Sequence, residues 1–242
     1  IDATKATVRG LRISGSRIHW RGGRIAAPGG MDAIGLPGYA VKITGQAIRV
    51  KSAIITNARK GMVIDRAASV LVDRNKFWRL REDGIIASRT SKLTVSYNRF
   101  SESKPLPTRC VLSDGQVVLG LASRDCRGTW TDGNHADAVQ MRNGMTDVTI
   151  ADNTVFGKTQ GLAQMDTLGD LPLRNVIIRN NTIVTDGYHR ITLTNCTGCA
   201  IRHNVARKAR GSTKKAVILP GLATRCGNIA EDEKVADGPC SA

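Results

Sequence analysis

The sequence predicts an all-β fold, a single-domain solenoid of about eight to nine stacked coils over residues 1–242. Three observations lead to this prediction. From residue 53 onward, a motif with one small or polar turn residue recurs at intervals of 22 to 28 residues, with one longer interval of 55. Apolar and polar residues alternate within the motif, and almost no stretch has the 3.6-residue period of a helix. A repeat of this length and pattern indicates short strands that stack coil upon coil.

The repeated pattern is apolar-x-apolar-x-x-Asn-x-apolar. It occurs at 70–77, 93–100, 148–155, 176–183 and 199–206, and two upstream segments, 11–18 and 48–55, fit with a small residue in place of Asn. The aligned turn positions are Ser16, Ala53, Asn75, Asn98, Asn153, Asn181 and Asn204. We interpret the 55-residue interval as two coils, one of which carries a long insertion around 102–133.

A second apolar pattern precedes each Asn by about a dozen residues. Each coil should therefore contain a strand, a turn, a second strand, the Asn turn and a third short strand. Asn tolerates left-handed turns, and stacked Asn side chains bond to one another, so we interpret these residues as structural. Phe77 and Phe100 take the same inward place in adjacent coils and should stack, with Val155 and Ile183 continuing their column.

The coil period, the G-I-x-I strand openings and the Asn column resemble the right-handed parallel β-helix of the pectate-lyase-like superfamily. The resemblance extends from about residue 8 to residue 229 and does not identify a family within the superfamily. It implies that a polysaccharide binds along the first sheet and the loops beside it. The insertion would then form one wall of the binding groove, where Trp130 is a candidate sugar contact.

The composition favours an anionic partner outside the cytosol. Lys and Arg number 36 against 20 Asp and Glu, a net charge of +16, which attracts nucleic acid, anionic lipid or acidic polysaccharide. No apolar run is long enough for a membrane span. Nucleic acid is disfavoured because aromatic and basic residues do not interleave in the sequence. We expect an acidic polysaccharide or oligosaccharide as partner, no nucleic acid, and a monomer.

Six Cys residues fall into three closely spaced pairs: Cys110 and Cys126, Cys196 and Cys199, Cys226 and Cys240. This spacing predicts disulfides, a C-terminal tail (226–242) that is pinned by a disulfide, and a secreted or periplasmic protein. The single CxxC has no second CxxC or HxxxH beside it, which argues against zinc.

The segment 133–144, GNHADAVQMRNG, holds most of the candidate site. In its strand, Val139 and Met141 should point inward, and Gln140 and Arg142 outward. Stacked coils then predict two outward columns, Gln140–Gln164–Thr192 and Arg142–Asp166–Thr194.

Three further residues complete the cluster. His135 and Asp137 lie at the entrance to the same strand, and His189 lies at the matching entrance two coils later, followed by an outward Arg190.

This cluster suggests β-elimination on a polymer of uronic acids. Arg142 or Arg190 would neutralise the substrate carboxylate, and Gln140 or Gln164 would donate a hydrogen bond to it. His135 or His189 would take the proton, since the pKa of His suits a base near neutral pH. The candidate catalytic residues are His135, Asp137, Arg142 and His189. The candidate substrate-binding residues are Gln140, Gln164, Asp166, Arg190 and Trp130.

Three alternatives stay open. An inverting hydrolase would use Asp137 and Asp166 as acid and base, but Arg142 and Arg190 should keep both ionised. A C5-epimerase shares the first step of the lyase, and a non-catalytic polysaccharide-binding or surface protein would need only the charge. Related lyases use Ca²⁺, but two carboxylates are few for that ion, so we expect no metal and no cofactor.

Overall fold

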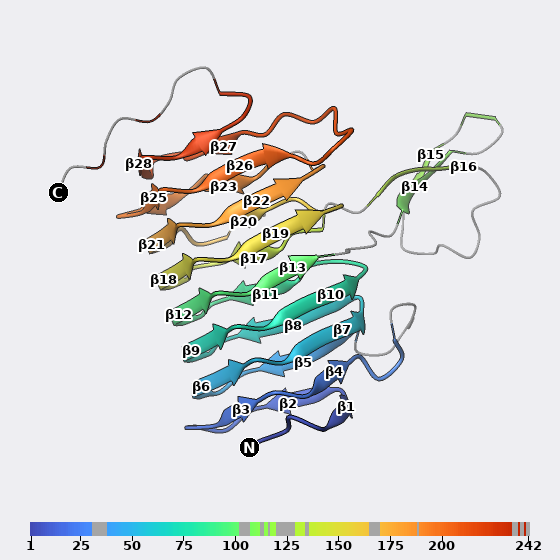
Figure 1. The fold of residues 1–242 in the computed structure, drawn as a ribbon, viewed down its shortest axis with the longest axis vertical. Coiled ribbons are helices and arrows are strands. Elements are labelled where there is room, and N and C mark those ends of the chain that lie inside the picture. Colours follow the sequence, from blue (N-terminus) through green and yellow to red (C-terminus); the bar gives the residue numbers. More distant parts are fainter. Residues whose placement is uncertain are drawn as a thin grey trace.

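The structure is a computed structural model. It describes residues 1–242 except 31–37, 102–106, 112–113, 116, 120–128, 134–135, 165–169, 188, 234–236, 238–239 and 241–242, and for the strands between 107 and 133 it describes the backbone alone. The described chain folds into three long sheets that run side by side along a stack of coils (Figure 1). Neighbouring strands in each of these sheets are parallel, which confirms the predicted all-β solenoid.

The first sheet has eight strands: β2 (Leu11–Ile13), β5 (Tyr39–Ile43), β8 (Lys60–Asp65), β11 (Ile85–Ser88), β17 (Val139–Arg142), β20 (Leu162–Gln164), β23 (Ile191–Thr192) and β27 (Ile218–Leu219). The second sheet contains β3 (His19–Arg21), β6 (Gln46–Lys51), β9 (Ala68–Asp73), β12 (Ser91–Ser96), β18 (Thr146–Ala151), β21 (Leu173–Arg179), β25 (Ala200–Arg202) and β28 (Thr224–Cys226), and β24 (Cys196–Thr197) also pairs with β21. The third sheet contains β1 (Thr7–Arg9), β4 (Arg24–Ala26), β7 (Ile54–Ala58), β10 (Lys76–Leu80), β13 (Arg99–Ser101), β19 (Thr154–Gly157), β22 (Thr182–Thr185), β26 (Val205–Lys208) and β29 (Ile229–Ala230).

One coil consists of a first-sheet, a second-sheet and a third-sheet strand in that order, as in β8, β9 and β10. This is the predicted arrangement of three strands. Val and Ile side chains from all three sheets fill the interior. Phe77 and Phe100 stack there with ring centroids 4.6 Å apart and planes 12° from parallel. Val155 pairs with Phe100 and Ile183 pairs with Val155, so the predicted apolar column is confirmed.

The Asn column is a continuous ladder between the second and third sheets. Each Asn side chain donates to the side-chain oxygen of the next, from Asn75 through Asn98, Asn153, Asn181 and Asn204 to Asn228, at 2.9–3.0 Å. The same oxygens accept backbone N–H groups, so the structural role of these residues is confirmed. The alignment of the repeats ended at Asn204 and did not include Asn228.

In the first coil the ladder position is Gly23, since Arg24 pairs with Ile54. The assignment of Ser16 to this column is wrong, because 11–18 supplies a first-sheet strand and Ser16 instead bridges Gln46.

The long interval between Asn98 and Asn153 is one coil, so its interpretation as two coils is wrong. β11 pairs directly with β17, β12 with β18 and β13 with β19. The intervening chain leaves the stack and forms a separate antiparallel sheet of β14 (Pro107–Val111), β15 (Val117–Leu119) and β16 (Thr129–Gly133), to the right of the coils in Figure 1. The predicted insertion is therefore an excursion from a single coil.

Two of the expected disulfides are present, Cys196–Cys199 and Cys226–Cys240. The second holds the C-terminal tail, where Arg225 also pairs with Glu233 and Asp237. Cys126 lies outside the described residues, so its pairing with Cys110 stays a prediction. No described segment forms a helix with the length and apolarity needed to cross a membrane.

Candidate active site

The candidate site lies where the chain turns from the third sheet into the first. In one coil this turn contains Glu82 and Asp83, and in the next coil it contains Asp137. The two turns stack in register, because the N–H of Gly84 donates to the carbonyl of Asp137 at 2.8 Å. We call the three carboxyl groups of Glu82, Asp83 and Asp137 the acidic corner.

Asp83 and Asp137 contact each other across the two coils. The backbone N–H of Asp137 donates to Oδ1 of Asp83 at 2.8 Å, and Nε2 of Gln140 donates to Oδ2 of Asp137 at 3.2 Å. Among the described residues, Oδ1 of Asp137 has no hydrogen-bond partner although it is buried. Only 6% of Asp83 and 1% of Asp137 are exposed, so both carboxyl groups are held away from water.

Glycines allow the coils to approach closely at this turn. A Cβ atom on Gly84 would lie 2.5 Å from the carbonyl oxygen of Ala138 and 2.7 Å from the ring of Phe100. A Cβ on Gly61, one coil earlier, would lie 2.4 Å from the carbonyl oxygen of Gly84. The absence of side chains at these positions brings the two aspartates together and contributes to their burial.

Burial raises the pKa of both aspartates above that of ordinary surface carboxyl groups. It raises the pKa of Asp83 to about 6, an effect that Glu82 reinforces and that the N–H of Asp137 and the charge of Lys60 oppose. Burial together with the charge of Asp83 raises the pKa of Asp137 well above its usual value. Asp137 therefore holds its proton to higher pH than an ordinary carboxyl group does, and it lies beside Asp83, which is mostly ionised at neutral pH.

Cations neutralise the third carboxyl group of the corner. Arg59 donates from both Nε, at 2.9 Å, and Nη2 to Oε1 of Glu82. Nζ of Lys60 lies 3.5 Å from Oε2 of the same side chain. These contacts limit the negative charge that Glu82 adds to Asp83.

Gln160 and His189 continue the register of Asp137 into the next coils. Val139 pairs with Leu162, and Leu162 pairs with Ile191. Two positions before these three residues lie Asp137, Gln160 and His189. The N–H of Gln160 donates to the carbonyl of Ala136 at 2.7 Å, which keeps the turns aligned. The predicted match between His189 and Asp137 is confirmed.

The predicted outward column through Gln164 is wrong by one residue. Gln140 pairs with Ala163, which pairs with Thr192, and Gln164 pairs with the inward Met141. Gln164 is buried, accepts the backbone N–H groups of Thr194 and Asn195, and donates to the carbonyl of Asn195. Gly161 takes the place of Ala138 in the turn, so the strand is in register one residue earlier than its apolar pattern suggested.

The prediction that Arg190 points outward is also wrong. Its side chain is completely buried, and its guanidinium donates to the backbone carbonyls of Thr185, Gly187 and Arg207. Arg190 lies in the turn itself, level with Gly161, so the alternation of a strand does not apply to it. These contacts hold the turn together and direct the guanidinium away from the surface of the first sheet.

Arg142 ends β17, where its Nε lies 3.8 Å from Oδ2 of Asp170. Its predicted partner Asp166 lies outside the described residues, as does His135. Trp130 belongs to β16, for which only the backbone is described. The structure therefore leaves these candidate roles untested.

Sequence reasoning missed Asp83 and Glu82. The signal was present, because an Asp precedes the first inward residue of the strand by two positions in both EDGII (82–86) and ADAVQ (136–140). Counting two coils between Asn98 and Asn153 separated these segments, whereas in the structure they are direct neighbours.

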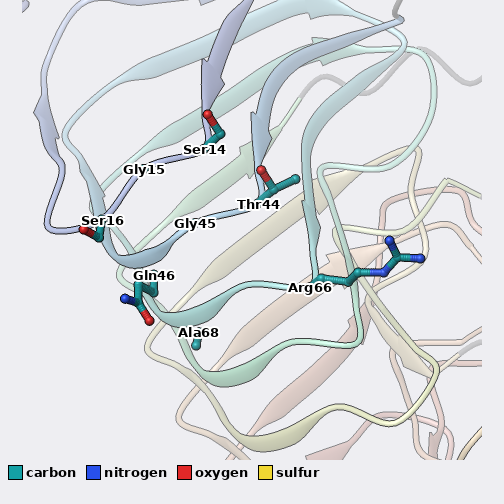
Figure 2. Close-up of a pocket in the computed structure, with 8 residues that line it drawn as sticks. All are labelled: Ser14, Gly15, Ser16, Thr44, Gly45, Gln46, Arg66 and Ala68. Atoms are coloured by element: carbon teal, nitrogen blue, oxygen red, sulfur yellow. The ribbon is translucent and has the colours of Figure 1, made fainter.

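A hollow of about 460 Å³ lies at the other end of the first-sheet strands, in the earliest coils. Ser14, Ser16, Thr44 and Gln46 line it with two glycines, and Figure 2 shows the side chain of Arg66 directed away from Ser14 and Thr44. Its lining contains no Asp, Glu, His or Lys, so it lacks the carboxyl groups that distinguish the acidic corner. Within the described part of the chain, no three His, Cys, Asp or Glu side chains gather as a metal site, and the expected absence of a cofactor stays a prediction.

Comparison with known proteins agrees with the architecture. The sequence profile of the family described as "Right handed beta helix region" matches residues 3–155. No curated protein sequence matches the chain.

Solved structures extend the likeness over nearly the whole chain. The Dettilon tailspike protein has 12% identity and a TM-score of 0.54, covering 93% of this chain and 48% of its own. The alginate lyase from Paenibacillus sp. str. FPU-7 has 14% identity and a TM-score of 0.50, covering 100% and 91%. The DFA-IIIase from Arthrobacter chlorophenolicus A6 has 12% identity and a TM-score of 0.49, covering 88% and 53%. This chain thus spans about half the length of the tailspike protein and of the DFA-IIIase, and at such identities the likeness is one of fold.

Proposed function

This chain belongs to the family of the right-handed β-helix region, and from that premise we propose that it is a secreted carbohydrate-active enzyme acting on an acidic, uronate-containing polysaccharide. The net charge of +16 supports an anionic substrate. The two described disulfides support an oxidising compartment outside the cytosol.

The observation that carries the proposal is the pair of buried carboxyl groups Asp83 and Asp137, which contact each other across adjacent coils and both have raised pKa values. Such a pair can cleave a glycosidic bond: Asp137 protonates the leaving oxygen while Asp83 attacks the anomeric carbon. Water then hydrolyses the ester to Asp83, and Asp137 takes back the proton from that water. Paired residues on adjacent coils lie about 4.8 Å apart, which suits the short carboxyl separation of retaining hydrolases.

The contacts of Arg190 weaken the sequence-based objection to hydrolysis. That objection assumed that Arg142 and Arg190 would keep both acids ionised. Arg190 bonds to three backbone carbonyls instead, and Arg142 lies near Asp170. Since only 1% of Asp137 is exposed, cleavage requires the corner to open locally so that the substrate reaches Oδ1, which accepts no hydrogen bond from any described residue.

β-Elimination is the second candidate, and the register of His189 with Asp137 and Gln160 favours it. In this mechanism a base removes the proton next to the uronate carboxylate, and the glycosidic oxygen leaves with a proton from an acid. His189 would be the base and Asp137 the acid. A C5-epimerase would start with the same proton removal.

The test is incubation with polygalacturonate, alginate, glucuronan and hyaluronan, with and without a chelator. We would follow reducing ends together with the ultraviolet absorbance of unsaturated uronate. Reducing ends alone would indicate hydrolysis, and both signals would indicate β-elimination. The chelator arm reports whether a metal is needed.

Matched variants connect activity to the corner. Asp137→Asn and Asp83→Asn should each lower the rate by at least about a hundredfold, because each removes one of the two groups that transfer the proton or form the bond. Asp65→Asn, on the outer face of the first sheet, should leave the rate unchanged. Full activity of both corner variants would overturn the assignment. A folded wild type that neither cleaves nor epimerises any of the four polymers would instead support a purely structural corner.

A further inference from the structure

The positive charge of the chain is concentrated in its early coils. Residues 1–101 contain 19 Lys and Arg against six Asp and Glu, whereas residues 102–242 contain 17 against 14. The excess that attracts an anion therefore lies on the coils before the excursion. The acidic corner lies at the boundary between these two parts, so its own residues do not explain the asymmetry.

The early coils also place cations where the backbone disfavours them. Of the eleven non-glycine residues with positive φ before residue 100, six are Lys or Arg: Arg17, Arg66, Arg74, Arg79, Arg89 and Lys92. In the later coils all six such residues are Asn, Asp or His, the types that tolerate this conformation best. The six cations are exposed. Lys and Arg at positive φ cost stability. Their presence here indicates that their positive charge serves binding.

One groove in the early coils gathers three arginines, one of which, Arg79, is among these six cations. It has a volume of about 400 Å³, lies on the outer face of the third sheet, and is lined by Thr7, Arg9, Arg24, Ala26, Thr56, Asn57, Trp78 and Arg79. We call it the cationic groove. Its lining contains three arginines and no carboxylate. Strands β1, β4, β7 and β10 pair in sequence beneath it, so the groove crosses four coils along the axis of the stack.

Trp78 organises the cations of this groove. The guanidinium carbons of Arg24 and Arg79 lie 5.6 Å and 5.0 Å from the centre of a Trp78 ring, and Nζ of Lys76 lies 5.0 Å from it. No described carboxylate forms an ion pair with Arg9, Arg24 or Arg79, in contrast to Arg59, Arg74 and Arg89. The ring therefore holds charges that have no counter-ion within the described chain, which prepares them for an external anion.

The indole of Trp78 adds a donor to the same place. Its Nε1–H is covered and has no hydrogen-bond partner among the described residues. A buried donor without a partner is unfavourable, so an anion that draws the surrounding cations toward itself could also accept this hydrogen bond.

From these observations we propose that the cationic groove is a binding site for a chain of acidic polysaccharide, separate from the acidic corner. Carboxylate or sulfate groups of the polymer pair with Arg9, Arg24 and Arg79, and sugar hydroxyls bond to the exposed Thr7 and Asn57. Single-stranded nucleic acid fits less well, because it needs a free aromatic face for stacking and cations already cover Trp78.

The groove shares its polymer class with the proposed function but does not rest on it, since binding needs no cleavage. It is also close to the acidic corner in the chain, because β10, which carries Trp78 and Arg79, leads directly into Glu82 and Asp83. A polymer anchored in the groove would therefore be retained next to the corner.

The test measures the affinity for polygalacturonate by calorimetry at low and at high salt. The variant Arg24→Gln/Arg79→Gln should bind at least about tenfold more weakly at low salt, because two charge-assisted contacts are lost. The control Arg202→Gln/Arg207→Gln removes the same charge from exposed positions of the later coils and should change affinity by less than about twofold. Circular dichroism and thermal unfolding check that both variants fold, and Arg24→Lys/Arg79→Lys, which keeps the charge, should recover part of the affinity.

Each other outcome contradicts the proposal. Equal losses in the two Gln pairs would mean that only net charge matters. Tighter binding of oligo(dT) than of polygalacturonate through Arg24 and Arg79 would assign the groove to nucleic acid. Asp83→Asn should bind polygalacturonate as the wild type does whether or not it still cleaves the polymer, so a variant with full cleavage and intact binding would overturn the corner assignment and leave the groove standing.

Discussion

The backbone N–H of Asp137 donates to the carboxylate of Asp83 at 2.8 Å and thereby joins two coils that are 54 residues apart in the sequence. The same carboxylate is buried and accepts this bond in its ionised form at neutral pH. Stability and protonation are therefore linked at this position.

The first prediction concerns stability against pH. Because the pKa of Asp83 is raised to about 6, the native state keeps this proton to higher pH than the unfolded chain does. The free energy of unfolding should therefore fall as pH rises from about 4 to 6, and the raised pKa of Asp137 extends the fall to higher pH. Asp83→Asn keeps an oxygen for the N–H of Asp137 but carries no charge, so it should raise the free energy of unfolding at pH 7 by roughly 1–3 kcal/mol.

Urea unfolding at a series of pH values measures this effect. Asp65→Asn is the control, since Asp65 is partly exposed and bonded to Arg89. A wild type whose stability rises from pH 4 to pH 7, together with an Asp83→Asn variant that is less stable at pH 7, would contradict the assigned pKa direction.

The second prediction concerns the close approach of the coils at Gly84. An added methyl group would meet the carbonyl of Ala138 and the ring of Phe100, so Gly84→Ala should cost about 1–3 kcal/mol of unfolding free energy. In Gly15→Ala the new Cβ would meet only the flexible end of Ile18, at 3.1 Å, and the cost should be well below that of Gly84→Ala. Equal thermal stability of the two variants would show that the corner is less tightly closed than the structure has it.

The architecture was predictable from the sequence because it rests on repetition. Coils of similar length place the same residue type at the same point, and ladders such as Asn75–Asn98 make that choice visible in the sequence. The long interval between two of the ladder residues was harder to interpret. Nothing in the residues between Asn98 and Asn153 distinguishes an extra coil from an excursion, since both supply strand-like segments.

The site was harder to predict because it depends on register at the turns. Gln140 has its outward place as predicted, since β17 follows the alternation from Val139 onward. Gln164 and Arg190 were misplaced because Gly161 and the turn before β23 shift the start of the next strands, and apolar alternation does not record such shifts. Asp83 became a candidate only when β11 and β17 were seen to be neighbours.

The third prediction tests the ladder. Asn153→Ala removes the oxygen that accepts both the backbone N–H and the side-chain amide of Asn98, at 2.9 and 3.0 Å. These buried donors are then left unpaired, so the free energy of unfolding should fall by about 2–4 kcal/mol. Thr149→Ala, on the outer face of the same coil, should cost less than about 1 kcal/mol. A ladder variant that is as stable as this control would mean that water replaces the lost oxygen.

The fourth prediction tests the cations at positive φ. Arg66 has φ of 50° and lies beside the hollow of Figure 2. Arg66→Asn should raise the free energy of unfolding by about 0.5–1 kcal/mol, since Asn adopts this conformation at lower cost. The same change should weaken binding of polyanions measurably at low salt. A loss of stability in this variant would contradict the view that these cations are retained for their charge.

The excursion has a consequence for how the solenoid holds together. The turn from β10 to β11 takes four residues (81–84), whereas the connection from β13 to β17 takes 37 (102–138). Closing the longer connection costs about 2 kcal/mol more in chain entropy, and every ladder bond between the two coils is still made across that seam. In a solenoid each coil contacts only its neighbours. At this seam the chain connection is long, but the non-covalent contacts between the two coils are the same as elsewhere. A chain cut within the excursion should therefore remain a single particle, because its two halves would still pair through β11 with β17, β12 with β18 and β13 with β19.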